Sequence, residues 1–226
     1  MSDPARTADH PEAPLVARRH AVLPVLLSLG VAALAAVVVV AFALAGPEAK
    51  DGHRAEVTVA QGTSTAPPWP APTGRGALED RAAGAGLEDV WGRDLAMHDH
   101  THVTITVDGE PVTVPGDVGH DEDARFAAEI HTHDTSGIVH VESPTDETFT
   151  LGQFFSEWGV ALDEEHVGSL GGTPEQQLTV WVGGKVHHGD PAEIVLEDLV
   201  DVDLVLAPEG RLATPPAPFD WPANYR

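Results

Sequence analysis

Histidines gather in two short stretches of this chain, and their spacing is suited to holding a metal ion. The first stretch reads HDHTHV and places imidazoles at alternate positions, His98, His100 and His102. The second, HTHDTSGIVHVES at residues 131–143, carries three more imidazoles around one small turn. Imidazole nitrogens and carboxylate oxygens are ligands that zinc, copper and related divalent metals accept. Because the chain contains no cysteine, nitrogen and oxygen would have to supply every protein ligand.

The register of the second stretch decides whether its side chains can meet. Side chains two residues apart share a strand face, and residues directly opposite on a paired strand lie about 5 Å apart. If DTSG forms a four-residue loop, His131 lies opposite His140, and one face collects Glu129, His131, His133, His140 and Glu142. A three-residue loop with Gly137 in a bulge would mix polar and apolar faces. We favour the four-residue loop because it separates the histidines from the valines.

The pattern predicts one site for a divalent transition metal, with zinc or copper the best suited. Its candidate ligands are His100, His102, His131, His133, His140 and Glu142. Asp134 is expected to stabilise the turn through its side chain. His187 and His188 are weaker candidates, and we expect His53, His120 and His166 to be exposed to solvent.

Three functions are compatible with this pattern. The first is a binding module that captures, buffers or transfers a metal. The second is a metal-dependent enzyme in which histidines hold the ion and Glu142 or Glu129 acts as the base. The third is an interaction domain without metal, whose histidines are incidental or titrate near pH 6–7. The sequence contains no G-x-S-x-G elbow, Walker loop, Rossmann fingerprint or H-E-x-x-H helix, so no standard catalytic motif supports the second.

The charge of the chain limits its partners. The formal net charge is −24 at pH 7. Nucleic acids and anionic lipid surfaces bind clusters of Lys and Arg, so both are poor partners for this chain. Cations are compatible partners.

An uncharged apolar segment at residues 21–45 predicts a single transmembrane helix, since roughly 20 such residues cross a bilayer. Arg18 and Arg19 precede it, so the positive-inside rule places tail 1–20 in the cytoplasm and the rest of the chain outside. A cleaved signal peptide is the alternative, because ALA at 43–45 resembles a cleavage site. Both interpretations place the C-terminal part of the chain on the extracytoplasmic side of the cell membrane.

The exported part divides by composition into a linker, a folded domain and a tail. Residues 46–96 include a Pro-, Ser-, Thr- and Gly-rich stretch and are predicted to be a linker or stalk, with a candidate short helix at 77–96. Residues 97–208 are predicted to fold, and residues 209–226 to form a proline-broken tail over the surface. Within the folded part, DG at 108–109, DTSG and GG at 183–184 are predicted hairpin turns. An apolar stripe behind Thr150 predicts a helix at 151–158.

This order of elements predicts an α+β fold, a small mixed sheet with one main helix. The stretch LTVWVGGKV followed by EIVLEDLVDVDLVL resembles the closing half of ubiquitin-like β-grasp domains, which implies a β-grasp-like sheet. Residues 97–160 also resemble a group of exported or membrane-anchored proteins from actinobacteria, archaea and other prokaryotes. The shared motifs are H-x-H before a strand, HTHD-x-SG-x-x-H-x-ES and TLG-x-FF-x-x-WG. That resemblance implies membership of the group and no particular reaction.

Overall fold

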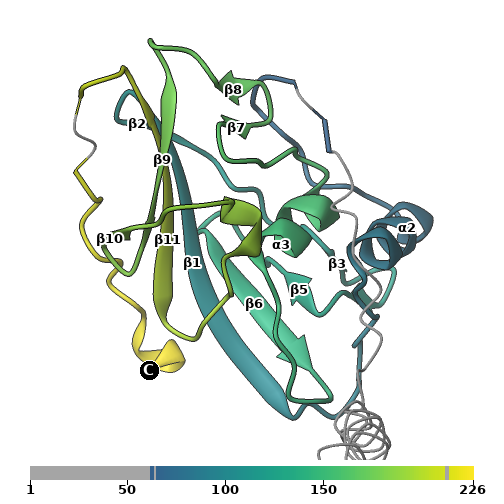
Figure 1. Ribbon diagram of the computed structural model, residues 1–226. Coiled ribbons are helices and arrows are strands. Elements are labelled where there is room, and N and C mark those ends of the chain that lie inside the picture. Colours follow the sequence, from purple (N-terminus) through teal and green to yellow (C-terminus); the bar gives the residue numbers. More distant parts are fainter. Residues whose placement is uncertain (1–61, 64, 212–213) are drawn as a thin grey trace, which may run out of the picture. The chain divides into compact units, whose positions relative to one another are not determined.

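Figure 1 shows the computed structural model, which describes residues 62–63, 65–211 and 214–226. The predicted cytoplasmic tail, the predicted transmembrane segment and the first part of the predicted linker lie outside these residues. Within the described residues, no helix combines the length and the apolar character needed to span a bilayer. His53, which we expected to be exposed, also lies outside them.

The fold is α+β and is built on one mixed sheet (Figure 1). Its strand order is β10-β9-β11-β1-β6-β5, and β2 extends it by pairing with β1. The two central strands, β1 and β11, run parallel, whereas every other pair in the sheet is antiparallel. The strands of this sheet are β1 (Met97–Val107), β2 (Glu110–Val112), β5 (Ile130–His131), β6 (Ile138–Ser143), β9 (Gln177–Val182), β10 (Lys185–Val186) and β11 (Val200–Ala207).

Shorter elements connect and cover the sheet. Two separate strand pairs are β3 (His120–Asp121) with β4 (Phe126–Ala127), and β7 (His166–Val167) with β8 (Leu170–Gly171). The helices are α2 (Arg75–Ala85) and α3 (Leu151–Trp158), with short 3₁₀ turns η1 (Pro191–Glu193) and η2 (Ala223–Tyr225).

The two glycine-containing turns predicted from DG and GG are present. Val107 pairs with Glu110, so Asp108 and Gly109 form a two-residue loop, and both have positive φ (52° and 89°). This is the left-handed conformation that a type I′ hairpin turn requires. Val182 and Lys185 pair in the same way around the two glycines that join β9 to β10.

The hairpin between β5 and β6 adopts the predicted register near its open end. Ile130 pairs with Val141 and His131 with His140. A four-residue DTSG loop would also pair Thr132 with Val139 and His133 with Ile138, and this part of the prediction is wrong. The backbone N–H of Thr132 instead donates to the carbonyl of Val118, at 3.0 Å. The ladder therefore stops after two residues, because a loop from earlier in the chain takes the hydrogen-bonding groups of the next one.

Helix α3 begins and ends where the apolar stripe predicts. The backbone N–H of Thr150 donates to Oε1 of Gln153, an interaction typical of a capping box. Phe154 and Phe155 are fully buried and Trp158 is 2% exposed. The helix thus supplies a large part of the core beneath the apolar face of the sheet.

Helix α2 (Arg75–Ala85) lies within the region where a candidate short helix was predicted at 77–96, although it begins two residues earlier and ends at Ala85. It packs against α3, so the domain has a second helix in its core beside the one main helix that was predicted. The described part of the predicted linker also differs from a stalk, because it contributes core residues, Trp69, Leu78, Ala82, Ala85 and Leu87. The indole N–H of Trp158 donates to the carbonyl of Trp69, at 3.2 Å. Residues that were predicted to be extended are therefore held by burial against α3.

Candidate metal centre

One face of the sheet is apolar and the other carries the histidines. Along β1, the side chains of Val103 and Ile105 are in the core, whereas the alternate residues point to the opposite face. The pairing of β1 with β6 sets His100 opposite His140 and His98 opposite Glu142. The hairpin register then adds His131 beside His140. Two segments 30 residues apart in the sequence thus share one histidine surface.

Two groups of three histidines lie close enough to bind a metal, and they share His140. The first group is His131, His133 and His140, whose candidate ligand atoms all lie within 4.8 Å of one another. The Nε2 atoms of His131 and His133 are 3.3 Å apart. With zinc–nitrogen bonds of about 2.0–2.1 Å, a tetrahedral site needs nitrogens about 3.3–3.4 Å apart. This pair therefore already has the separation of two zinc ligands.

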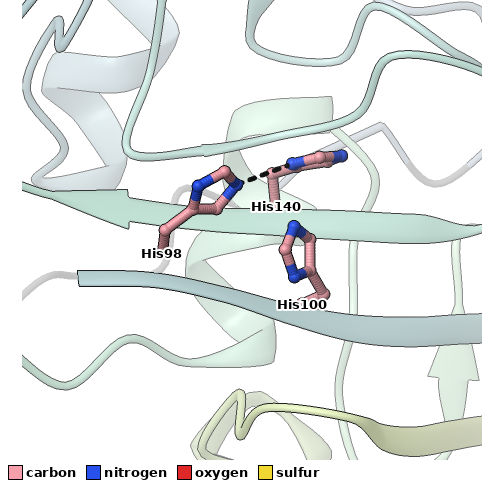
Figure 2. A group of neighbouring side chains, drawn as sticks. All are labelled: His98, His100 and His140. Carbon is pink, nitrogen blue, oxygen red and sulfur yellow. Dashed lines mark hydrogen bonds between the residues drawn. The ribbon is translucent and has the colours of Figure 1, made fainter. Parts of the chain in front are cut away.

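The second group is His98, His100 and His140 (Figure 2). Nε2 of His98 lies 3.4 Å from Nδ1 of His140, again the separation of two tetrahedral ligands. Glu142 borders the same space, with Oε1 3.1 Å from Nε2 of His98 and 3.9 Å from Nδ1 of His140. This group can therefore offer three nitrogens and one carboxylate oxygen.

The orientation of His131 is held by a backbone contact. Its side chain is 1% exposed, and Nδ1 lies 2.8 Å from the carbonyl oxygen of Ala128. A carbonyl can only accept, so Nδ1 carries the proton and Nε2 keeps its lone pair. Metal-bound histidines are usually oriented by such a bond from the second ring nitrogen. His131 thus presents Nε2 toward His133 without needing a metal to turn the ring.

The environment keeps these imidazoles uncharged at neutral pH. Burial lowers the pKa of His131 well below its usual 6.5. Burial, followed by repulsion from His133, His100 and His98, lowers the pKa of His140 to about 3. The pKa values of His133 and His100 are also lowered, mainly by burial. Neutral imidazoles are the form that binds a metal, and a cation would not have to displace protons from these four.

His102 was a predicted ligand, but the structure does not bring it into either group. Its Nε2 lies 3.2 Å from the carbonyl oxygen of Ser136, and its ring stacks on Phe219 at 3.8 Å between centroids. Its Nδ1 is 3.6 Å from Asp201. The position opposite His102 on β6 is occupied by Ile138, which offers no ligand atom. His102 therefore joins β1 to the DTSG turn and to the C-terminal segment.

His120 was expected to be exposed, and this is wrong. Its side chain is 13% exposed, and its ring centroid is 4.5 Å from that of His133 and 5.5 Å from that of His131. The same hydrogen bond between Thr132 and Val118 that ends the β5–β6 ladder brings His120 over the hairpin. The one sequence signal for this was a histidine inside the acidic stretch GHDEDAR.

An open pocket of about 490 Å³ lies beside His120 and His133. Its remaining lining residues are Pro72, Thr73, Asp117, Asp121, Glu122 and Asp123. The carboxylates make this opening favourable for a cation, since clustered charge of one sign raises the local concentration of counter-ions. The histidine cluster is therefore accessible from an acidic side.

Glu129 and Asp134 make structural hydrogen bonds. Glu129 is 4% exposed, and its carboxylate accepts hydrogen bonds from the N–H of Glu88 and the hydroxyl of Ser143, both at 3.0 Å. Asp134 accepts from the N–H of Ser136, as predicted for a turn residue. Away from the cluster, His166 contacts Asp163 at 2.9 Å and is 39% exposed. His187 and His188 belong to neither histidine group.

Comparisons with protein-family models, with curated proteins and with solved structures find no match for this chain.

Proposed function

We propose that this chain is a membrane-anchored, extracytoplasmic domain that captures, buffers or passes on a divalent transition metal. The observation that carries the proposal is the group His131, His133 and His140, whose nitrogens lie within 4.8 Å of one another. His131 and His140 are buried, and the carbonyl of Ala128 fixes the ring orientation of His131. A nitrogen-rich site with a nearby carboxylate suits zinc or copper, both of which bind His and carboxylate ligands.

Binding, rather than catalysis, is the better supported role. Glu129, one of the two bases considered, is occupied by Glu88 and Ser143 and lies in neither histidine group. Glu142, the other, contacts His98 and so is better placed as a ligand than as a free base.

The anchor and the fold family belong to the same proposal. The uncharged segment 21–45 behind Arg18 and Arg19 supports a single-pass anchor with the folded domain outside the cell membrane. The parallel central pair β1 and β11, flanked on both sides by antiparallel strands, supports a β-grasp-like arrangement. The motifs around the histidines support membership of the exported prokaryotic group that they resemble.

The test is calorimetric titration of the protein, purified without a histidine tag, with Zn²⁺, Cu²⁺ and Ni²⁺ at pH 7.5 and 5.5. We expect binding tighter than about 1 µM for at least one ion at pH 7.5. Because burial lowers the pKa of His131 and lowers that of His140 to about 3, the loss of affinity from pH 7.5 to pH 5.5 should be smaller than for a site made of exposed imidazoles with the usual pKa of 6.5. Saturating metal should also raise the melting temperature by linkage. The variant His133→Ala should weaken binding at least tenfold, and because His133 is exposed, the fold should survive.

His188→Ala is the matched control, since it removes an exposed histidine outside both groups. It should bind as the wild type does. No binding tighter than about a millimolar for any of the three ions, or unchanged binding in His133→Ala, would refute the proposal and favour an interaction domain without metal.

A further inference from the structure

We propose that the domain holds two divalent cations at once, one on each side of His140, with the ring of His140 bridging them. This rests on the proposed metal-binding function and extends it from one site to two. The observation behind it is that the two histidine groups, each with three possible ligands, have this one residue in common.

The orientation of the shared ring is the first step of the argument. Nδ1 of His140 faces Nε2 of His98, at 3.4 Å. Figure 2 shows the second ring nitrogen of His140 on the side away from His98. The two lone-pair directions of an imidazole diverge, so a cation bound at Nδ1 leaves Nε2 free for another. The ring is therefore turned so that its two nitrogens serve different spaces.

Each of these spaces has enough further ligands for its own cation. On the Nδ1 side, which we call the outer site, His98 and His100 supply nitrogens and Glu142 supplies an oxygen. The second ring nitrogen would serve the other site, which we call the inner site. Its further ligands would be the other members of that group, His131 and His133, whose rings lie 5.3 Å and 4.5 Å from that of His140. With His140 included, the site on the Nδ1 side has four protein ligands, which complete a tetrahedral shell. The site with His131 and His133 has three, which leaves one position open.

The open position of the inner site has a neighbour that could fill it. His120 lies with its ring 4.5 Å from that of His133, and both residues line the acidic pocket. A cation entering by that pocket would meet His120 and His133. The outer site would be reached from the side of His98, whose side chain is 49% exposed.

Bridging changes the protonation of His140. A neutral imidazole carries one N–H, and both nitrogens can donate to metals only if that proton leaves to solvent. The product is an imidazolate with one negative charge between two dications. This charge, the carboxylate of Glu142 and the acidic surroundings oppose the repulsion between the cations.

The experiment uses the full-length chain, solubilised in detergent and free of any histidine tag, with Cu²⁺ as the probe. Bound copper per chain is measured by elemental analysis and its magnetic state by electron paramagnetic resonance. We expect two copper ions per wild-type chain, with most of the signal of isolated Cu²⁺ lost at saturation because an imidazolate bridge couples the two spins. One proton more per chain should be released than for a single ion bound to neutral histidines.

Variants of exposed residues separate the two sites. His98→Ala should leave one copper in the inner site, and His133→Ala one copper in the outer site, each with the full signal of an isolated ion. His188→Ala should keep two coupled ions. All three substitutions are at exposed positions, so the fold should be kept. Circular dichroism checks this and so distinguishes loss of a metal site from loss of the fold.

Three results would overturn the inference. One copper in the wild type, abolished by either variant, would show a single ion shared by both groups, and the proposed function would stand. Two coppers with full, uncoupled signal would refute the bridge. No copper binding in the wild type would refute both the bridge and the metal-binding function.

Discussion

Glu157 is the residue whose surroundings are least expected for its chemistry. It lies on α3, is fully buried, and neither carboxylate oxygen has a hydrogen-bond partner among the described residues. Burial raises its pKa from 4.5 to about 8, and the nearby Arg81 only partly opposes this. The side chain is therefore protonated at neutral pH in the folded protein, where an exposed glutamate would be ionised.

This shift predicts a pH-dependent loss of stability. The folded pKa lies above the unfolded one, so the contribution of Glu157 is complete below about pH 4.5 and is lost as the pH rises toward 8. Each pH unit in that window removes up to about 1.4 kcal/mol. Glu157→Gln, which cannot ionise, should avoid the loss. The difference in urea-unfolding free energy between variant and wild type should grow in favour of the variant from pH 5 to pH 8.

Comparing the two proteins at each pH cancels the contribution of the histidines, which both share. A constant difference across that range would show that Glu157 is ionised in the fold.

At the level of elements, α3 is where sequence pattern and burial agree most closely. Phe155 is fully buried, and its ring lies 5.5 Å from that of Trp158. Replacing a buried aromatic with alanine typically costs about 3–5 kcal/mol. We expect Phe155→Ala to lower the free energy of unfolding by that amount, measured by urea denaturation at pH 7.

Val195→Ala is the matched control, because Val195 is an apolar residue that is 41% exposed. Its effect should stay within about 0.5 kcal/mol. If Phe155→Ala melted like this control, α3 would not be part of the core.

For the whole molecule, the distribution of charge predicts its orientation in the membrane. The chain has a net charge of −24, yet segment 21–45 has no charged residue and Arg18 and Arg19 precede it. An alkaline phosphatase reporter, which is active only after export, should be active when fused after Arg226. The same reporter fused within residues 1–20 should be inactive.

A substitution tests the role of the two arginines. Replacing Arg18 and Arg19 with glutamate should reduce the activity of the C-terminal fusion, because the substitution weakens the positive-inside bias. An inactive C-terminal fusion in the unmodified chain would contradict the proposed topology.

The sequence by itself determined the features that depend on neighbouring residues. Alternation and turn chemistry predicted the pairing of His131 with His140 and the hairpin turn at Asp108 and Gly109, and helical spacing predicted α3 from its first to its last residue. These patterns are local because side-chain direction repeats every two residues in a strand and every 3.6 in a helix.

Tertiary structure alone decided which residues from distant segments meet. His120 joins the cluster because Thr132 bonds to Val118 instead of continuing its hairpin, and His102 leaves it because Phe219 and Ser136 hold its ring. Helix α2 enters the core although its sequence shows little amphipathic pattern, since its few apolar residues are buried against α3. In each case the outcome depends on contacts between segments far apart in the chain, whose packing and hydrogen bonds have no local sequence period.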